Sequence, residues 1–186
     1  MIESDLPEHD GDLLEVPVPG AVLSPNGKYR YLLTRDLLTP MERMGIASHE
    51  RAVFLMVNPS TADATVDDNT IRRCIDYARS WGYTDLWVCN LSPYRATNPM
   101  DLKENGRDPA HVEDANLSIV RRAIQCSDLV VAAWGAHGCY EGRSAAMREM
   151  LADTETWCLG TTADGEPRHP LMMRKDVVLA RWPVPG

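Results

Sequence analysis

The stretch Phe54-Leu55-Met56-Val57-Asn58-Pro59-Ser60 is central to interpreting this chain, because an apolar run there ends abruptly on Asn-Pro. An uninterrupted apolar run predicts a strand buried on both faces, since a strand with one face in water alternates apolar and polar residues. In open α/β folds, ligands bind where such strands end. We therefore expect the chemistry of this protein near Asn58.

The remainder of the chain repeats this pattern of apolar runs separated by amphipathic segments. Apolar runs occupy residues 52–57, 86–90, 129–134 and 157–159, with a shorter candidate at 177–179. Residues 69–80, 112–126 and 142–151 carry apolar side chains at helical spacing. This repetition predicts an α/β fold, a single-domain three-layer α/β/α sandwich with a mainly parallel central sheet.

The N-terminal part of the chain has a different character. Residues 1–20 contain six carboxylates and no Lys or Arg, and they have few periodic apolar residues. Residues 21–35 place Pro25-Asn26-Gly27 between two apolar stretches, which predicts a β-hairpin. We therefore divide the chain into an acidic flexible N-terminal arm, residues 1–20, and a single α/β domain, residues 21–186.

Charge and hydropathy limit the classes of partner. The formal net charge is -8, but without the acidic arm it is about -2. Strong non-specific duplex binding is therefore not expected, although local Arg pairs could contact phosphates. No apolar run approaches the roughly 18 to 20 residues of a membrane span, and the N-terminus lacks the apolar segment of a signal peptide. We expect a cytoplasmic protein that does not engage a membrane.

The five cysteines do not suggest a metal centre. Cys74, Cys89, Cys126, Cys139 and Cys158 are scattered, and no C-x-x-C spacing occurs. We expect reduced structural thiols, no metal site and no cofactor.

The first candidate site combines Asn58 and Ser60 with the acidic loop that follows them. An Asn cannot take a proton at neutral pH, but its amide can position a water molecule or a substrate. The carboxylates of Asp63, Asp67 and Asp68 could activate water or bind a divalent cation. In the purely structural alternative, Asn58-Pro59 is a turn and Thr65 or Asp68 caps the next helix.

The second candidate site follows another apolar run, where Asn90 precedes Tyr94 and Arg95. A carboxamide pairs one donor with one acceptor and so matches the edge of a nucleobase, and a Tyr ring can stack on a base. The structural alternative is an Asn that caps a strand, with an ordinary surface Tyr.

The third candidate site is Arg168-His169-Pro170, in which an imidazole held in a tight loop could donate to an oxyanion. Gly135 and His137 lie after another apolar run, and the glycine permits close approach of the backbone to a ligand. The structural alternative is an unremarkable loop His and an ordinary strand-to-helix turn.

The chain resembles the DUF1643 family over nearly everything from residue 20 to the end. The resemblance rests on Asn58-Pro59-Ser60-Thr61-Ala62-Asp63-Ala64, Trp81-Gly82-Tyr83, Asn90-Leu91, Tyr94-Arg95-Ala96-Thr97, Trp134-Gly135 and Arg168-His169-Pro170-Leu171. The order Asn-Pro, Asn, Trp-Gly and His-Pro also resembles the uracil-DNA glycosylase-like superfamily. Three features differ from that superfamily. Met56 stands where a Gly commonly begins the first motif, and Leu171 replaces the Ser after His-Pro. No aromatic residue directly follows Asn58-Pro59 to stack on a base.

The resemblance to glycosylases implies a fold of that type and roles for three residues. Asn58 would position the hydrolytic water, Asn90 would read the base, and His169 would stabilise negative charge on the departing base. With Asp63 as a further catalytic candidate, the expected substrate-binding residues are Asn90, Ser60, Tyr94, Arg95, Gly135, His137 and Arg168.

We therefore expect a hydrolase of glycosylase type that acts on the N-glycosidic bond of a modified base in DNA or a nucleotide. Its partner would be a nucleic acid or nucleotide substrate. One alternative is a non-catalytic nucleobase- or nucleotide-binding module on the same fold. Another is an interaction protein that uses the long loop 93–109 and the acidic arm to bind a second protein.

Overall fold

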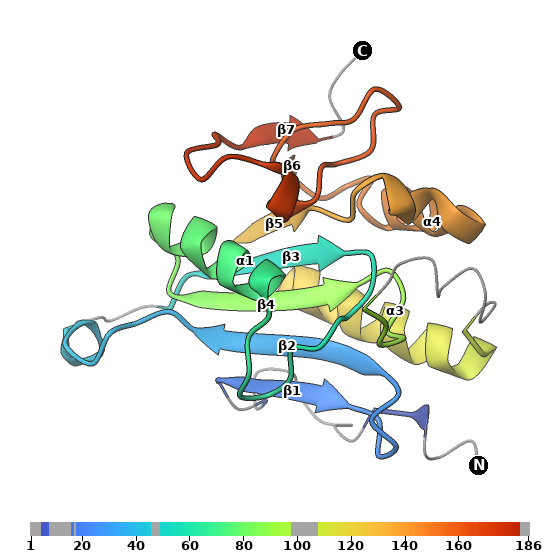
Figure 1. Cartoon of the computed structure of the whole chain (residues 1–186), viewed down its shortest axis with the longest axis horizontal. Helices are drawn as coiled ribbons and strands as arrows, with labels where there is room; N and C mark the ends of the chain where they lie inside the picture. Colours follow the sequence, from blue (N-terminus) through green and yellow to red (C-terminus); the bar gives the residue numbers. More distant parts are fainter. Residues whose placement is uncertain (1–4, 8–15, 17, 46–48, 98–107, 183–186) are drawn as a thin grey trace.

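The computed structural model describes residues 5–7, 16, 18–45, 49–97 and 108–182, and in this part of the chain it contains seven strands and three α-helices (Figure 1). The strands are β1 (Gly20–Leu23), β2 (Arg30–Asp36), β3 (Arg51–Met56), β4 (Asp85–Asn90), β5 (Leu129–Ala132), β6 (Thr156–Cys158) and β7 (Ala180–Trp182). The α-helices are α1 (Asn69–Ser80), α3 (Ala110–Gln125) and α4 (Arg143–Met150). Short 3-10 helices are η3 (Glu42–Met44), η4 (Ala136–Gly142) and η5 (Pro170–Met172).

The strands form one mixed sheet in the order β1-β2-β4-β3-β5-β6-β7. The central strands β4, β3, β5 and β6 run parallel, whereas β2 is antiparallel to both β1 and β4, and β7 is antiparallel to β6. The expectation of a mainly parallel sheet is therefore wrong for the flanks. The connection from β1 to β2 is too short for the crossover that parallel neighbours require, so this pair forms the predicted hairpin.

The helices cover both faces of the sheet, as expected for three layers (Figure 1). One face buries Val53 and Trp87 against apolar residues of α3 and α4, and the other buries Phe54 and Val88 against α1. Neighbouring residues of β3 and β4 thus enter opposite cores, which explains why these strands read as continuous apolar runs.

The predicted helices agree closely with the observed ones. Residues 69–80 are α1, and the other two helices differ from the prediction by at most two residues at either end. The last strand lies at Ala180–Trp182 rather than at 177–179. Trp182 packs edge-on against Trp134 with ring centroids 5.0 Å apart, and this contact places residues 180–182, not the preceding apolar residues, opposite β6.

Two described parts of the acidic arm contact the domain. The Asp5 carboxylate accepts a hydrogen bond from Asn26 Nδ2 at 2.6 Å, the Tyr31 hydroxyl donates to the Asp5 carbonyl oxygen, and Val16 is buried in the core. Gly20, the last residue of the predicted arm, begins β1. Residues 1–4, 8–15 and 17 lie outside the described residues, as does most of the loop 93–109. No helix in the described residues is both long and apolar enough to cross a membrane.

Candidate functional site

A cavity of about 440 Å³ lies at the carboxyl ends of β3 and β4, beside the turn that follows β5. Its lining includes seven of the ten residues that the sequence suggested for the site: Asn58, Ser60, Asn90, Gly135, His137, Arg168 and His169. The parallel arrangement of β3, β4 and β5 brings these residues together, because the carboxyl ends of parallel strands share one edge of the sheet.

Asn90 is the last residue of β4 and pairs with Met56 across the sheet. Its side chain is 1% exposed, yet neither Nδ2 nor Oδ1 has a hydrogen-bond partner among the described residues. Buried amide groups in proteins are nearly always hydrogen-bonded, and leaving one unpaired is costly. The amide therefore offers an adjacent donor and acceptor to a ligand in the cavity.

Asn58 has a different arrangement, because its amide nitrogen is already occupied. Nδ2 donates to the carbonyl oxygens of Pro59 at 2.9 Å and of Ala96 at 2.8 Å. These two acceptors bind the nitrogen end of the carboxamide and so fix its orientation, which leaves the oxygen end, Oδ1, pointing the opposite way. Asn58 thus joins two loops at the rim of the cavity and keeps one acceptor for a water molecule or a ligand.

His169 is held in one tautomer by the backbone. The amide of Leu171 donates to its Nδ1 at 3.3 Å, so the proton of the neutral imidazole resides on Nε2. Burial lowers the pKa of His169 below its usual 6.5, the negative charge of Asp68 opposes this effect, and His137 adds to it. At neutral pH His169 is therefore an uncharged donor through Nε2.

Gly135 allows the loop that carries His169 to approach closely. Its φ is +74°, and a Cβ atom at this position would lie 3.3 Å from Cβ of His169. The Gly135 amide also donates to the carbonyl oxygen of Pro167 at 2.8 Å. A glycine is needed here both for the left-handed backbone and for the space.

Glu166 fixes the same loop from its other side. Its carboxylate accepts hydrogen bonds from Trp134 Nε1 at 2.6 Å, from Ser144 Oγ at 2.7 Å and from Arg148 at 3.2 Å. Burial acts to raise the pKa of Glu166, but these hydrogen bonds outweigh it and lower the pKa. An ionised Glu166 therefore ties the loop before His169 to the segment that follows β5 and to α4.

Arg30 is a cavity residue that the sequence analysis did not select. It begins β2, is 2% exposed, and donates from Nη1 to the carbonyl oxygen of Ala62 at 2.8 Å. Burial lowers its pKa to about 10, against the favourable charge of Asp68. The available signal was a cation between Tyr29 and Tyr31, directly before the apolar residues Leu32 and Leu33, but the hairpin pattern alone does not show which side it faces.

Asp68 is the single carboxylate among the described residues that line the cavity. Its Oδ1 accepts from the Ile71 amide at 2.9 Å and so caps α1, as the structural alternative predicted. Of the three acids considered for water activation, Asp68 alone reaches the cavity.

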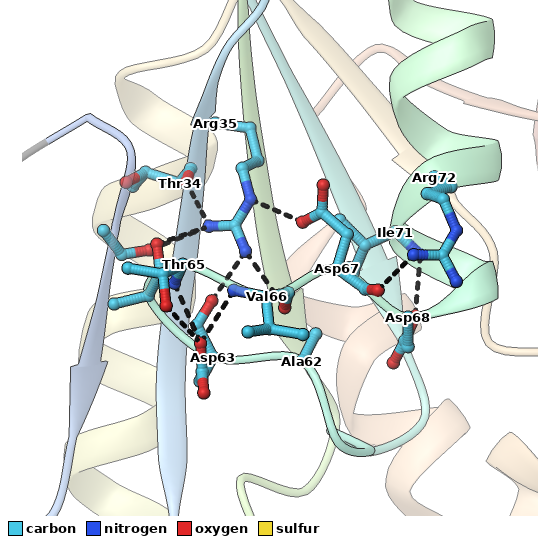
Figure 2. A network of polar contacts seen from close by, with 12 residues as sticks. Thr34, Arg35, Ala62, Asp63, Thr65, Val66, Asp67, Asp68, Ile71 and Arg72 are labelled. Carbon is cyan, nitrogen blue, oxygen red and sulfur yellow. Dashed lines mark hydrogen bonds and ion pairs between the residues drawn. The ribbon is translucent and has the colours of Figure 1, made fainter.

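Asp63 lies outside the cavity lining and instead shapes the loop before α1, as Figure 2 shows. Its Oδ1 accepts from the amides of Thr65 and Val66, both at 2.8 Å, and these bonds lower its pKa. Asp67 pairs with Arg35 at 2.6 Å (Figure 2). Both carboxylates thus support the loop that presents Asp68.

Tyr94 and Arg95 also lie outside the cavity lining and contact the β1–β2 turn. The Tyr94 ring packs edge-on against Tyr29 with centroids 6.1 Å apart, and Arg95 Nη1 donates to the Gly27 carbonyl oxygen at 3.2 Å. Within the described part of the chain, no group of three or more His, Cys, Asp or Glu side chains is placed to hold a metal ion.

Fold and site together define a mixed α/β protein with a partly apolar, amide-bearing cavity at the ends of its parallel strands. The family model described as "Protein of unknown function (DUF1643)" matches residues 30–171, and the chain belongs to this family. The match begins at Arg30 and ends at Leu171, both of which line the cavity. No curated protein and no solved structure matches the chain, so the resemblance to glycosylases stays a prediction.

Proposed function

We propose that this protein is a hydrolase of glycosylase type, which releases a nucleobase by cleaving its N-glycosidic bond. The observation that carries the proposal is the unpartnered amide of Asn90, buried in the same cavity as Asn58 and His169. An adjacent donor and acceptor on a buried side chain match the hydrogen-bonding edge of a base. Met56, Val88 and Ile71 supply apolar surface for its ring.

The proposed reaction needs only water as second reactant. The water oxygen bonds to C1′ of the sugar, and the electron pair of the breaking C1′–N bond leaves with the base. Asn58 Oδ1 orients the water. Asp68 accepts the proton of the water, because it is the single carboxylate among the described residues that line the cavity. His169 donates from Nε2 to the base as negative charge develops on it.

In this mechanism, hydrogen-bonding groups that are already in place before substrate binds supply most of the rate acceleration. Removing one such donor from an enzyme that stabilises a developing anion costs about 100- to 1,000-fold in kcat. The hydrogen bond that His169 Nδ1 accepts and those that Asn58 Nδ2 donates hold both side chains in place before substrate arrives. No cofactor enters the proposed cycle, and a cytoplasmic nucleotide or nucleic acid is the proposed substrate.

The test is a base-release assay on purified protein with oligonucleotides and free nucleotides that bear standard and modified bases. Free base is detected chromatographically. Asp68→Asn provides the key variant, because Asn caps a helix as well as Asp but cannot accept a proton. We expect Asp68→Asn to lose at least about 100-fold in base release, with unfolding free energy within about 1 kcal/mol of wild type.

The competing assignment is a nucleobase- or nucleotide-binding module without catalysis. It predicts that a ligand raises the midpoint of thermal unfolding while no substrate yields free base. That combination of results would contradict the hydrolase assignment and support a protein that only binds the ligand.

A further inference from the structure

Arg30 is a buried cation on the cavity wall that forms no ion pair with a carboxylate, although the negative charge of Asp68 favours its charged form through space. In the described residues no ion pair reaches it within 4.0 Å, its Nε has no acceptor, and Nη1 meets only the Ala62 carbonyl. Removing a charge from water is costly unless an opposite charge or a full set of hydrogen bonds replaces the lost hydration. A guanidinium also cannot avoid this cost by losing its proton at neutral pH.

Arg35, on the same strand, shows what a satisfied buried arginine looks like in this protein. It is 6% exposed, pairs with Asp67 at 2.6 Å and donates to the carbonyl oxygens of Thr34 at 2.7 Å and Asp63 at 2.6 Å (Figure 2). Arg30 is more deeply buried but lacks an equivalent set of partners. The difference between the two arginines is that Arg30 faces the cavity and Arg35 does not.

The charge of the cavity is opposite in sign to that of the whole protein. The described lining contains Arg30 and Arg168 but only one carboxylate, Asp68, whereas the chain carries a formal net charge of -8. Such a cavity attracts a small anion. A long polyanion would also have to approach the rest of an acidic molecule, which opposes its binding.

We propose that the cavity binds a free nucleotide, with Arg30 holding its phosphate while Asn90 holds its base. The substrate class of the hydrolase is then a nucleoside 5′-monophosphate rather than a base within a polynucleotide. A cavity of about 440 Å³ lies in the range that encloses a whole small ligand. A guanidinium fork binds two phosphate oxygens at once. This inference rests on the proposed function for its base-binding end.

Isothermal titration calorimetry with six nucleotides and their matching nucleosides tests whether Arg30 binds the phosphate. The probes are the 5′-monophosphates of deoxyuridine, deoxyinosine and the four standard deoxynucleosides. We expect at least one monophosphate to bind at least about tenfold more tightly than its nucleoside, as for a buried charge pair. Arg30→Gln should reduce this ratio to about two or less, while Arg30→Lys, which keeps the charge, should retain part of it.

Arg174→Gln is the matched control, because it removes one positive charge from an exposed side chain that pairs with Asp176 outside the cavity. It should leave the ratio unchanged, and an equal loss in both variants would mean a general charge effect and overturn the inference. Circular dichroism confirms that each variant is folded. If Arg30→Gln does not fold, equal affinity of wild type for nucleotides and nucleosides still overturns the inference.

Two further results separate this inference from the proposed function. A single-stranded oligonucleotide that contains the same base internally and binds as tightly as the monophosphate would overturn the free-nucleotide assignment, whether or not base is released. Arg30-dependent binding of a monophosphate without base release would support this inference and overturn the hydrolase assignment.

Discussion

Two buried asparagines use their amides in opposite ways, and this difference separates a ligand-binding residue from a structural one. Asn90 and Asn116 are each 1% exposed. Asn116 donates from Nδ2 to the backbone oxygen of Asn90 at 2.9 Å, although its Oδ1 has no partner in the described residues. Asn90 has no such partner at either Nδ2 or Oδ1, and of the two residues it alone lines the cavity. Only the amide of Asn90 remains available to the cavity.

We therefore expect Asn90→Leu to keep the free energy of unfolding within about 1 kcal/mol of wild type, since it replaces unpaired polar atoms by apolar ones of similar size. The same variant should lose nucleotide binding. Asn116→Leu, the matched control, should cost about 1–3 kcal/mol because it leaves a buried carbonyl unpaired. Urea denaturation measures both, and a larger loss in Asn90→Leu would assign Asn90 to the structural framework.

His169 should make stability depend on pH in one direction. Burial lowers its pKa from 6.5, so the unfolded state binds a proton more readily than the folded state. The stabilising effect of the neutral imidazole is present above about pH 6.5 and is lost as pH falls toward the lower folded-state pKa. Between about pH 7.5 and pH 5, wild type should lose more unfolding free energy than His169→Gln.

Parallel urea titrations at the two pH values measure this difference. Equal losses in wild type and His169→Gln would show that His169 is not the group responsible.

At the scale of elements, the position of His169 depends on the turn between β5 and η4, because Gly135 in this turn lies against His169. Gly135 and Gly165 both have a positive φ, +74° and +77°, but only a Cβ at Gly135 would meet another residue, at 3.3 Å from His169 Cβ. A side chain at either glycine would therefore strain the backbone, but only a side chain at Gly135 would also press against His169.

Gly135→Ala and Gly165→Ala should each lower the free energy of unfolding by about 1–2 kcal/mol, the cost of a left-handed residue. Base release should fall only in Gly135→Ala, because its new methyl group displaces His169. Chemical denaturation and the base-release assay measure the two effects. Equal activities in the two variants would show that the position of His169 does not limit the reaction.

At the scale of the whole molecule, the seven strands form a continuous sheet whose two faces each carry a core. The parallel strands β3 and β4 contribute to both cores, so the loss of either helical layer exposes apolar residues of the same central strands. The single domain expected for residues 21–186 stays a prediction, which the unfolding of the chain can test.

We accordingly expect cooperative unfolding as one unit. Tryptophan fluorescence should follow the same urea transition as far-ultraviolet circular dichroism. The tryptophans include reporters on different parts of the sheet, for example Trp87 in the central strand β4 and Trp182 in the edge strand β7. Distinct midpoints for the two signals would indicate more than one folding unit.

How far the sequence predicts this molecule depends on the range of the interactions involved. Helix α1 was predicted residue for residue, because its cap Asp68 and its apolar spacing are local signals. Strand β7 was displaced by three residues, since its position follows from the packing of Trp182 on Trp134. The antiparallel flank at β7 depends on the same contact and has no local signature.

The sequence by itself determined the central strands, the helices between them and the polar residues Asn58, Asn90 and His169 at strand or loop ends, because periodicity and turn chemistry act between near neighbours. Only the tertiary structure decided that these three share one cavity, that Asp63, Tyr94 and Arg95 lie outside its lining, and that Arg30 and Asp68 belong to it. The physical reason is that hydrogen-bond partners and burial are set by segments far apart in the chain. The side of the strand that a residue such as Arg30 presents depends on strand pairing.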